Sequence, residues 1–133
     1  MKRISVRAII NYDDGIILIH RVKSDHDYYV FPGGGIENNE TYEECIIREV
    51  IEELGIIIEP KKELYTVEDD KSIAKFYLCS YVSGELGSGI GPEFSSEDYS
   101  GTGEYIPVVI KLEDFNKLNI FPTKIKENLL NGV

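Results

Sequence analysis

The first third of the chain shows the two-residue alternation of apolar and polar positions that is typical of strands. Residues 4–10 place Ile4, Val6, Ala8 and Ile10 on one side of this pattern. Because successive strand side chains point to opposite faces, the pattern predicts a strand with one buried face. Residues 13–15 read Asp-Asp-Gly and predict a tight turn, so we expect the apolar run at 16–19 to return as the second strand of a hairpin.

A change of period marks the next part of the chain. A polar loop at 23–27 and a short strand at 28–31 end at Pro32 and three consecutive glycines. From about Glu40 to Leu54 the apolar positions recur with helical spacing. Gly55 is the expected stop, because glycine readily adopts the left-handed conformation that ends many helices.

The second half predicts further strands at 63–67, 73–82 and 105–110, where β-branched and aromatic residues are frequent. Residues 83–103 hold six of the twelve glycines without apolar periodicity, which is typical of a functional or disordered loop. The four-residue spacing of apolar residues after Pro122 predicts a closing amphipathic helix. Together these elements predict one domain over residues 1–133, an α/β (α+β) sandwich with a mixed sheet.

Charge and composition narrow the function classes. The 133 residues include 24 acidic side chains against 14 lysines and arginines, for a formal charge of −10. This charge disfavours long nucleic acid as a partner, because backbone phosphates are bound by basic side chains. It is compatible with a small phosphate substrate if divalent cations neutralise the carboxylates, although composition alone favours solubility as the role of the acid excess.

Location is predicted from what the sequence lacks. There is no apolar run near the 18 residues of a membrane span, and the N-terminus does not resemble a secretion signal. Cys45 and Cys79 have no CxxC spacing, so neither a zinc site nor a disulfide framework is indicated. We therefore expect a cytoplasmic protein without a membrane partner.

The predicted central helix has one acidic and one apolar face. A step of 100° per residue puts Glu52 and Glu53 within about 60° of Glu49. Such like charges destabilise an isolated helix by roughly 0.2–0.5 kcal/mol per pair, and a divalent cation would reverse this effect. A solvated acidic face is the alternative. The residues expected to pack on the sheet are Ile47, Val50, Ile51 and Leu54.

The helix and the glycines before it share a known motif. Gly34, Glu40 and residues 48–56, which read REVIEELGI, resemble the Nudix box GX5EX7REUXEEXGU, in which U is an aliphatic residue. All nine defined positions over 23 residues match without a gap. The resemblance implies a Nudix-type (MutT-like) α/β/α sandwich whose box forms a loop, a helix and a second loop.

The resemblance also implies roles for residues of the box. Mg2+ or Mn2+ is expected to bind Glu49, Glu52 and Glu53, with the Gly34 carbonyl as a further ligand. Glu49 is favoured to orient or deprotonate the attacking water, and Glu52 is kept among the catalytic residues because family members vary in which carboxylate serves as base. Arg48 is expected to orient a neighbouring glutamate.

Outside the box, Nudix enzymes often add a distant carboxylate to the metal cluster. Among the acids in or beside residues 83–103 we favour Glu97, with a solvated acid as the alternative. Arg21 at the end of the second strand is a candidate for substrate phosphate, since arginine forms paired hydrogen bonds to such oxygens. The aromatic side chains that could stack on a base, or could equally serve packing, are Tyr28, Tyr29 and Tyr99.

The expected function is metal-dependent hydrolysis of a nucleoside diphosphate derivative, with an oxidised nucleoside triphosphate as first choice. Sugar nucleotides such as ADP-ribose, dinucleoside polyphosphates and capped RNA ends remain alternatives. A nucleotide-binding Nudix-like module without catalysis is the alternative from another class, although such modules typically show a degraded box. A homodimer is left open.

Overall fold

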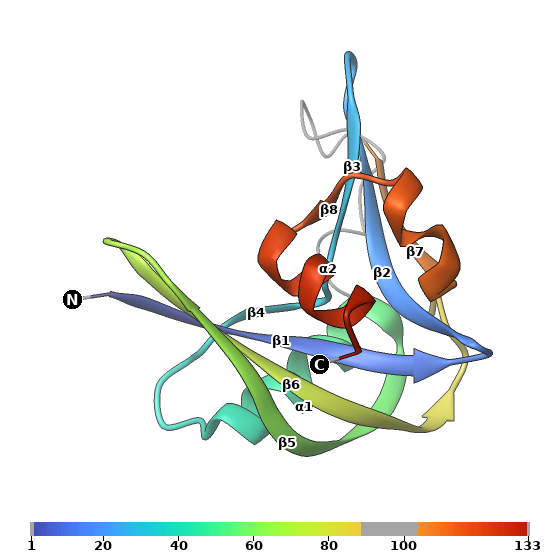
Figure 1. Cartoon of the computed structure of the whole chain (residues 1–133). Helices are drawn as coiled ribbons and strands as arrows, with labels where there is room; N and C mark the ends of the chain where they lie inside the picture. Colours follow the sequence, from blue (N-terminus) through green and yellow to red (C-terminus); the bar gives the residue numbers. More distant parts are fainter. Residues whose placement is uncertain (1, 89–103, 133) are drawn as a thin grey trace.

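A computed structural model of the chain describes residues 2–88 and 104–132 and contains one curled, mixed, eight-stranded sheet with helices on both sides (Figure 1). The strand order is β5-β6-β1-β2-β3-β8, with β4 paired to β1 and β7 paired to β2. In chain order the elements are β1 (Arg3–Tyr12), β2 (Gly15–Val22), β3 (Asp27–Val30), β4 (Gly33–Gly35), α1 (Tyr42–Leu54), β5 (Ile56–Glu68), β6 (Ser72–Gly84), β7 (Glu104–Ile110), the 3-10 helix η2 (Leu112–Lys117), β8 (Ile120–Phe121) and α2 (Thr123–Leu130).

The architecture confirms the predicted mixed α/β (α+β) sandwich. Two predicted boundaries were wrong, because β5 begins at Ile56 directly after the helix and β6 extends to Gly84. The short strands β4 and β8 and the helix η2 were not predicted. Among the described residues, no helix is both long and apolar enough to span a membrane.

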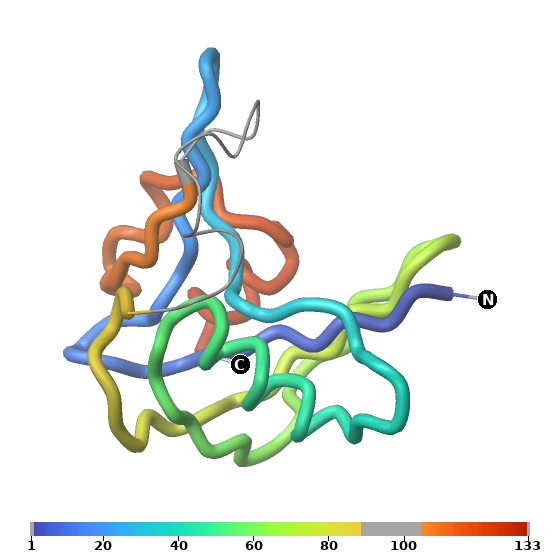
Figure 2. Tube along the Cα trace, turned by 180° about the vertical axis from the view of Figure 1, so that it is seen from behind, coloured from blue at the N-terminus to red at the C-terminus, as the bar shows by residue number. Residues whose placement is uncertain are grey.

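The first hairpin opens into a fork. β1 and β2 pair only beside their turn, at Asn11 with Ile16 and Tyr12 with Gly15. Beyond the turn β1 pairs with β4 and, in parallel, with β6, whereas β2 pairs with β3 and β7. Figure 2 shows the two halves of the sheet diverging, with the N-terminal end of β1 beside the β5–β6 turn. This divergence leaves a space whose walls come from both halves.

Each face of the sheet covers its own apolar core. On β1, Val6, Ala8 and Ile10 pack beneath α1, whereas Ile9 belongs to the cluster on the other face. That second cluster includes Phe115 of η2 and residues of α2. Alternate side chains of β1 therefore pack into two different cores, and both faces of β1 are covered.

The helix α1 begins and ends at strong local signals. Thr41 caps it, because the Thr41 hydroxyl accepts from the Glu44 amide while the Glu44 carboxylate accepts from the Thr41 amide. Gly55 ends it in the left-handed region at φ 76°, as predicted. The helix therefore starts at Tyr42 rather than near Glu40.

The prediction for the buried face of α1 was partly wrong. Val50 and Leu54 are fully buried, but Ile47 and Ile51 are only partly covered. The residues that take the remaining inward positions are Cys45, Ile46 and Glu53. The helix is thus turned so that one carboxylate of the acidic face points toward the protein interior.

The capping box gives a direct test of this local account. Replacing Thr41 by Ala removes the acceptor of the Glu44 amide, so we expect the free energy of unfolding to fall by about 1 kcal/mol. Thr41→Ser keeps the hydroxyl and should retain most of the wild-type value. Urea denaturation of the three proteins measures the difference, and equal stability of Thr41→Ala and wild type would contradict the assignment of Thr41 as the cap.

Candidate active site

Three glycines form the strand that runs between β1 and α1. A Cβ on Gly34 would lie 2.5–2.6 Å from the carboxylate atoms of Glu49, so any other residue at this position would displace that carboxylate. Gly33 has φ 146°, and a Cβ there would lie 2.1 Å from the Val6 carbonyl oxygen. The strand β4 can therefore approach the helix and β1 closely because it carries no side chains.

Glu53 is the buried carboxylate of the site and has 3% of its surface exposed. Its Oε1 accepts from the Gly33 amide at 2.6 Å, and its Oε2 accepts from the Tyr105 hydroxyl of β7. Burial raises the pKa of the Glu53 carboxyl to about 7, although both hydrogen bonds and the nearby Arg7 act in the opposite direction. Glu53 thus joins α1 to both halves of the sheet.

Arg48 organises the remaining carboxylates of the box. Its Nε and Nη2 donate to the Glu40 carboxylate at 2.5 and 3.0 Å, a paired arrangement that lowers the pKa of Glu40 to about 2. Its Nη1 donates to Glu49 at 3.0 Å and to Glu52 at 3.1 and 3.2 Å. Arg48 therefore contacts Glu40, Glu49 and Glu52, and the Glu40 carboxylate is held in place by this pairing.

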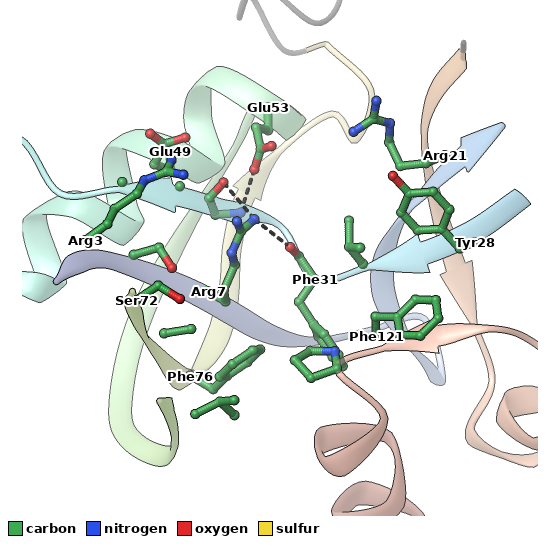
Figure 3. Close-up of a pocket in the computed structure, with 18 of the residues that line it drawn as sticks. Arg3, Arg7, Arg21, Tyr28, Phe31, Glu49, Glu53, Ser72, Phe76 and Phe121 are labelled. Atoms are coloured by element: carbon green, nitrogen blue, oxygen red, sulfur yellow. Dashed lines mark hydrogen bonds between the residues drawn. The ribbon is translucent and has the colours of Figure 1, made fainter. Parts of the chain in front are cut away.

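A pocket of about 830 Å³ occupies the fork between the halves of the sheet. Glu49, Glu53 and the strand Gly33–Gly35 form one wall (Figure 3). Other residues come from β1, β2, β3, β5, β6, β7 and β8. The Nudix-box residues thus open onto a space large enough for a nucleotide-sized ligand.

Arginine is concentrated at this site. The chain has four arginines and ten lysines, and three of the arginines line the pocket while none of the lysines does. Arg3 and Arg7 come from β1 and Arg21 from β2. Arg21 also lies over the Tyr105 ring, with its Cζ 4.9 Å from the ring centroid. A strongly acidic protein therefore places three of its four planar, permanently charged cations in one pocket.

The substrate residues suggested by the sequence are only partly brought together. Arg21 and Tyr28 line the pocket. Tyr29 does not line it, and its ring stacks on His20 with 4.2 Å between the ring centroids. Glu97 and Tyr99 lie outside the described residues.

The predicted metal ligands are also divided. Glu49 and Glu53 line the pocket, but Glu52 lies on the outer side of α1 with Arg48. Within residues 2–88 and 104–132, no three His, Cys, Asp or Glu side chains gather closely enough to hold a metal ion. The oxygen donors of Glu49 and Glu53 nevertheless fit a hard divalent cation, and Gly34 leaves room for the Glu49 carboxylate.

The pocket-lining residues that the sequence did not predict include two arginines and two aromatic residues, namely Arg3, Arg7, Tyr105 and Phe121. Arg3 and Arg7 could have been found, because the same alternation that buries Val6 places both arginines on the opposite face of β1. Phe121 and Tyr105 reach the pocket through strand pairings that are distant in sequence.

Comparison with known proteins identifies the family. The NUDIX domain matches residues 1–108, and the chain belongs to this family. It is 33% identical over 93 residues to an ADP-ribose pyrophosphatase of Methanocaldococcus jannaschii, a match that covers 65% of this chain and 55% of that protein. It is 33% identical over 69 residues to an 8-oxo-dGTP diphosphatase of Proteus vulgaris, covering 50% of this chain and 62% of that protein.

The chain thus spans less than two thirds of the length of either relative. Among solved structures, a MutT from work on Aliivibrio salmonicida and Vibrio cholerae superposes with a TM-score of 0.75 at 19% identity, covering 100% of both chains. At that identity the likeness shows the fold.

The raised pKa of Glu53 predicts how stability depends on pH. Without metal, folded Glu53 keeps its proton up to about pH 7, whereas the unfolded chain releases it near 4.5. Stability therefore falls as pH rises through this window, because the folded state binds more protons. Glu53→Gln has no such proton, so above pH 7 we expect it to exceed the wild type by on the order of 1–3 kcal/mol.

Urea denaturation in a metal chelator at pH 4.5 and pH 8 measures this difference, and any other titrating groups largely cancel between the two proteins. A stability difference that is the same at both pH values would show that Glu53 titrates normally and is not desolvated in the folded protein.

Proposed function

We propose that this protein hydrolyses a diphosphate linkage in a nucleoside diphosphate derivative with the help of Mg2+ or Mn2+. The observation that carries the proposal is the composition of one pocket, which combines Glu49 and Glu53 with three arginines beside a bare glycine strand. Carboxylates suit hard divalent cations, and arginine suits phosphate oxygens. A substrate with several negative charges requires both kinds of group.

The reaction consumes one water. Its oxygen forms a bond to one phosphorus, the bridging P–O bond breaks, and two phosphate products separate with release of a proton. A cation held by Glu49, Glu53 and the Gly34 carbonyl would supply charge neutralisation and a lower pKa for its water.

The protein side chains have distinct roles in this proposal. Glu49, which lines the pocket, orients or deprotonates the water, whereas Glu52 lies on the outer side of α1. Arg48 fixes both carboxylates through its Nη1. Arg21 binds a substrate phosphate, and its position above Tyr105 limits the directions in which its guanidinium can point.

The pocket also supports a nucleotide rather than inorganic polyphosphate alone. Tyr28 and Phe121 line one end with ring centroids 6.0 Å apart, and Phe121 keeps 46% of its surface exposed despite being apolar. An aromatic pair at a pocket edge, with Phe121 exposed and Tyr28 half-buried, offers a stacking surface for a base. The two curated relatives, named for ADP-ribose and for 8-oxo-dGTP, support a nucleotide of this general class.

Regulatory binding without catalysis is the competing function. The intact box and the hydrogen-bonded arrangement of Glu40, Arg48 and Glu49 favour catalysis.

The buried thiols of Cys45 and Cys79 are free, which suits the proposed cytoplasmic location.

Glu53→Gln tests the proposal through activity. The substitution keeps the side-chain volume but removes one charged oxygen ligand, so we expect Mg2+-dependent turnover to fall roughly 100-fold or more. Release of phosphate and pyrophosphate from a panel of nucleotide diphosphate derivatives provides the measurement, and the best wild-type substrate is then used for the variant.

Glu43→Gln is the matched control, because Glu43 is an exposed acid in the first turn of the same helix and does not line the pocket. It should keep wild-type turnover. If Glu53→Gln turned over substrate as fast as the wild type with the same Mg2+ dependence, Glu53 would have no part in the mechanism. If no substrate in the panel were cleaved by the wild type, the binding module would be favoured.

A further inference from the structure

Arg3 and Arg7 form a row along β1 that the hydrolytic mechanism leaves without a role. Both project from the pocket-facing side of the strand, two residues on either side of Ser5, which also lines the pocket. β4 runs beside them, with Ser5 opposite Gly35 and Arg7 opposite Gly33. A Cβ on Gly35 would lie 3.5 Å from Arg3 Nη2, and one on Gly33 would lie 3.0 Å from Arg7 Cδ.

The two guanidinium groups have donors to spare. Arg7 Nη1 donates to the carbonyl oxygens of Phe31 and Gly33 at 3.3 and 3.2 Å, which fixes its position. In the described part of the chain, the Arg3 side chain has neither a hydrogen bond nor an ion pair. A guanidinium carries five N–H donors, so this row offers anchored and uncommitted donors to a ligand.

This row lies at the opposite end of the pocket from the aromatic side chains. Figure 3 shows Arg3 and Ser72 far from Tyr28 and Phe121, with Arg7 between them. Asp69 also lines the Arg3 end, but its Oδ1 accepts from the amides of Lys71 and Ser72 at 2.8 Å. The Asp69 carboxylate is therefore already hydrogen-bonded within the β5–β6 turn.

We propose that Arg3 and Arg7 bind a further phosphate of the substrate, beyond the diphosphate linkage that is cleaved. The inference rests on the proposed function and narrows its substrate class. With the base at Tyr28 and Phe121, a ligand that spans the pocket places its distal group beside Arg3. A nucleotide with a third phosphate would satisfy these donors, whereas an uncharged sugar at that position would leave the Arg3 guanidinium without an anionic partner.

ATP and ADP-ribose form a matched pair for the test, because both contain adenosine and a diphosphate but differ in their distal group. Binding is measured by calorimetry in a metal chelator, so that no turnover occurs. Inorganic triphosphate is added as a probe without a base. The variants are Arg3→Gln, Arg3→Lys and the control Lys71→Gln, which removes the same charge from a lysine that does not line the pocket.

We expect wild type to bind ATP more tightly than ADP-ribose. Arg3→Gln should weaken ATP and inorganic triphosphate about tenfold and ADP-ribose less than twofold, because only the first two place a phosphate at Arg3. Arg3→Lys should retain part of the ATP affinity, and Lys71→Gln should match the wild type for all three ligands. Equal losses for ATP and ADP-ribose in Arg3→Gln would overturn the proposal, as would wild-type protein that does not bind inorganic triphosphate.

Turnover with Mg2+ separates this inference from the proposed function. Hydrolysis that is indifferent to Arg3 would reject the distal phosphate site and leave the hydrolase intact. If ATP bound as expected but no nucleotide were hydrolysed, the proposed hydrolase function would be rejected and the arginine site would be retained.

Discussion

The hydrogen bond from the Gly33 amide to the Glu53 carboxylate is the contact on which the site depends. It joins α1 to the strand β4 at 2.6 Å, in a place from which water is largely excluded. The same carboxylate accepts from Tyr105 of β7, on the other half of the sheet. The consecutive elements β4 and α1 therefore meet the distant strand β7 at one acidic group, whose burial would be costly without these partners.

This contact explains the orientation of the helix and the charge pattern around it. Turning Glu53 inward leaves Ile51 partly exposed, and it brings Glu49 to the edge of the pocket. Arg48 compensates the remaining acids on the outer side. In the pocket, the arginines of β1 and β2 face the same space as Glu49 and Glu53. A protein with a formal charge of −10 therefore presents both acidic and basic side chains to an anionic ligand.

Local patterns predicted much of the fold, because they depend on neighbours in sequence. The alternation in β1 and the helix ending at Gly55 need only periodicity and backbone preferences. The rotation of α1 could not be predicted, since apolar periodicity alone favours Ile51 over Glu53 as the buried residue. The partners of Glu53 come from β4 and β7, and no local signal indicates those pairings. Phe121 reaches the pocket for the same reason, through its parallel pairing with Val30.

We propose that Glu53 and Glu49 form a divalent-cation site on the pocket wall. Anomalous diffraction from crystals of the wild-type protein soaked in Mn2+ tests it most directly, because the anomalous signal locates the ion independently of any assumed chemistry. We expect an ion in contact with the Glu49 and Glu53 carboxylates, and its loss in crystals of Glu53→Gln. Manganese bound only elsewhere, or bound equally well in Glu53→Gln, would contradict it.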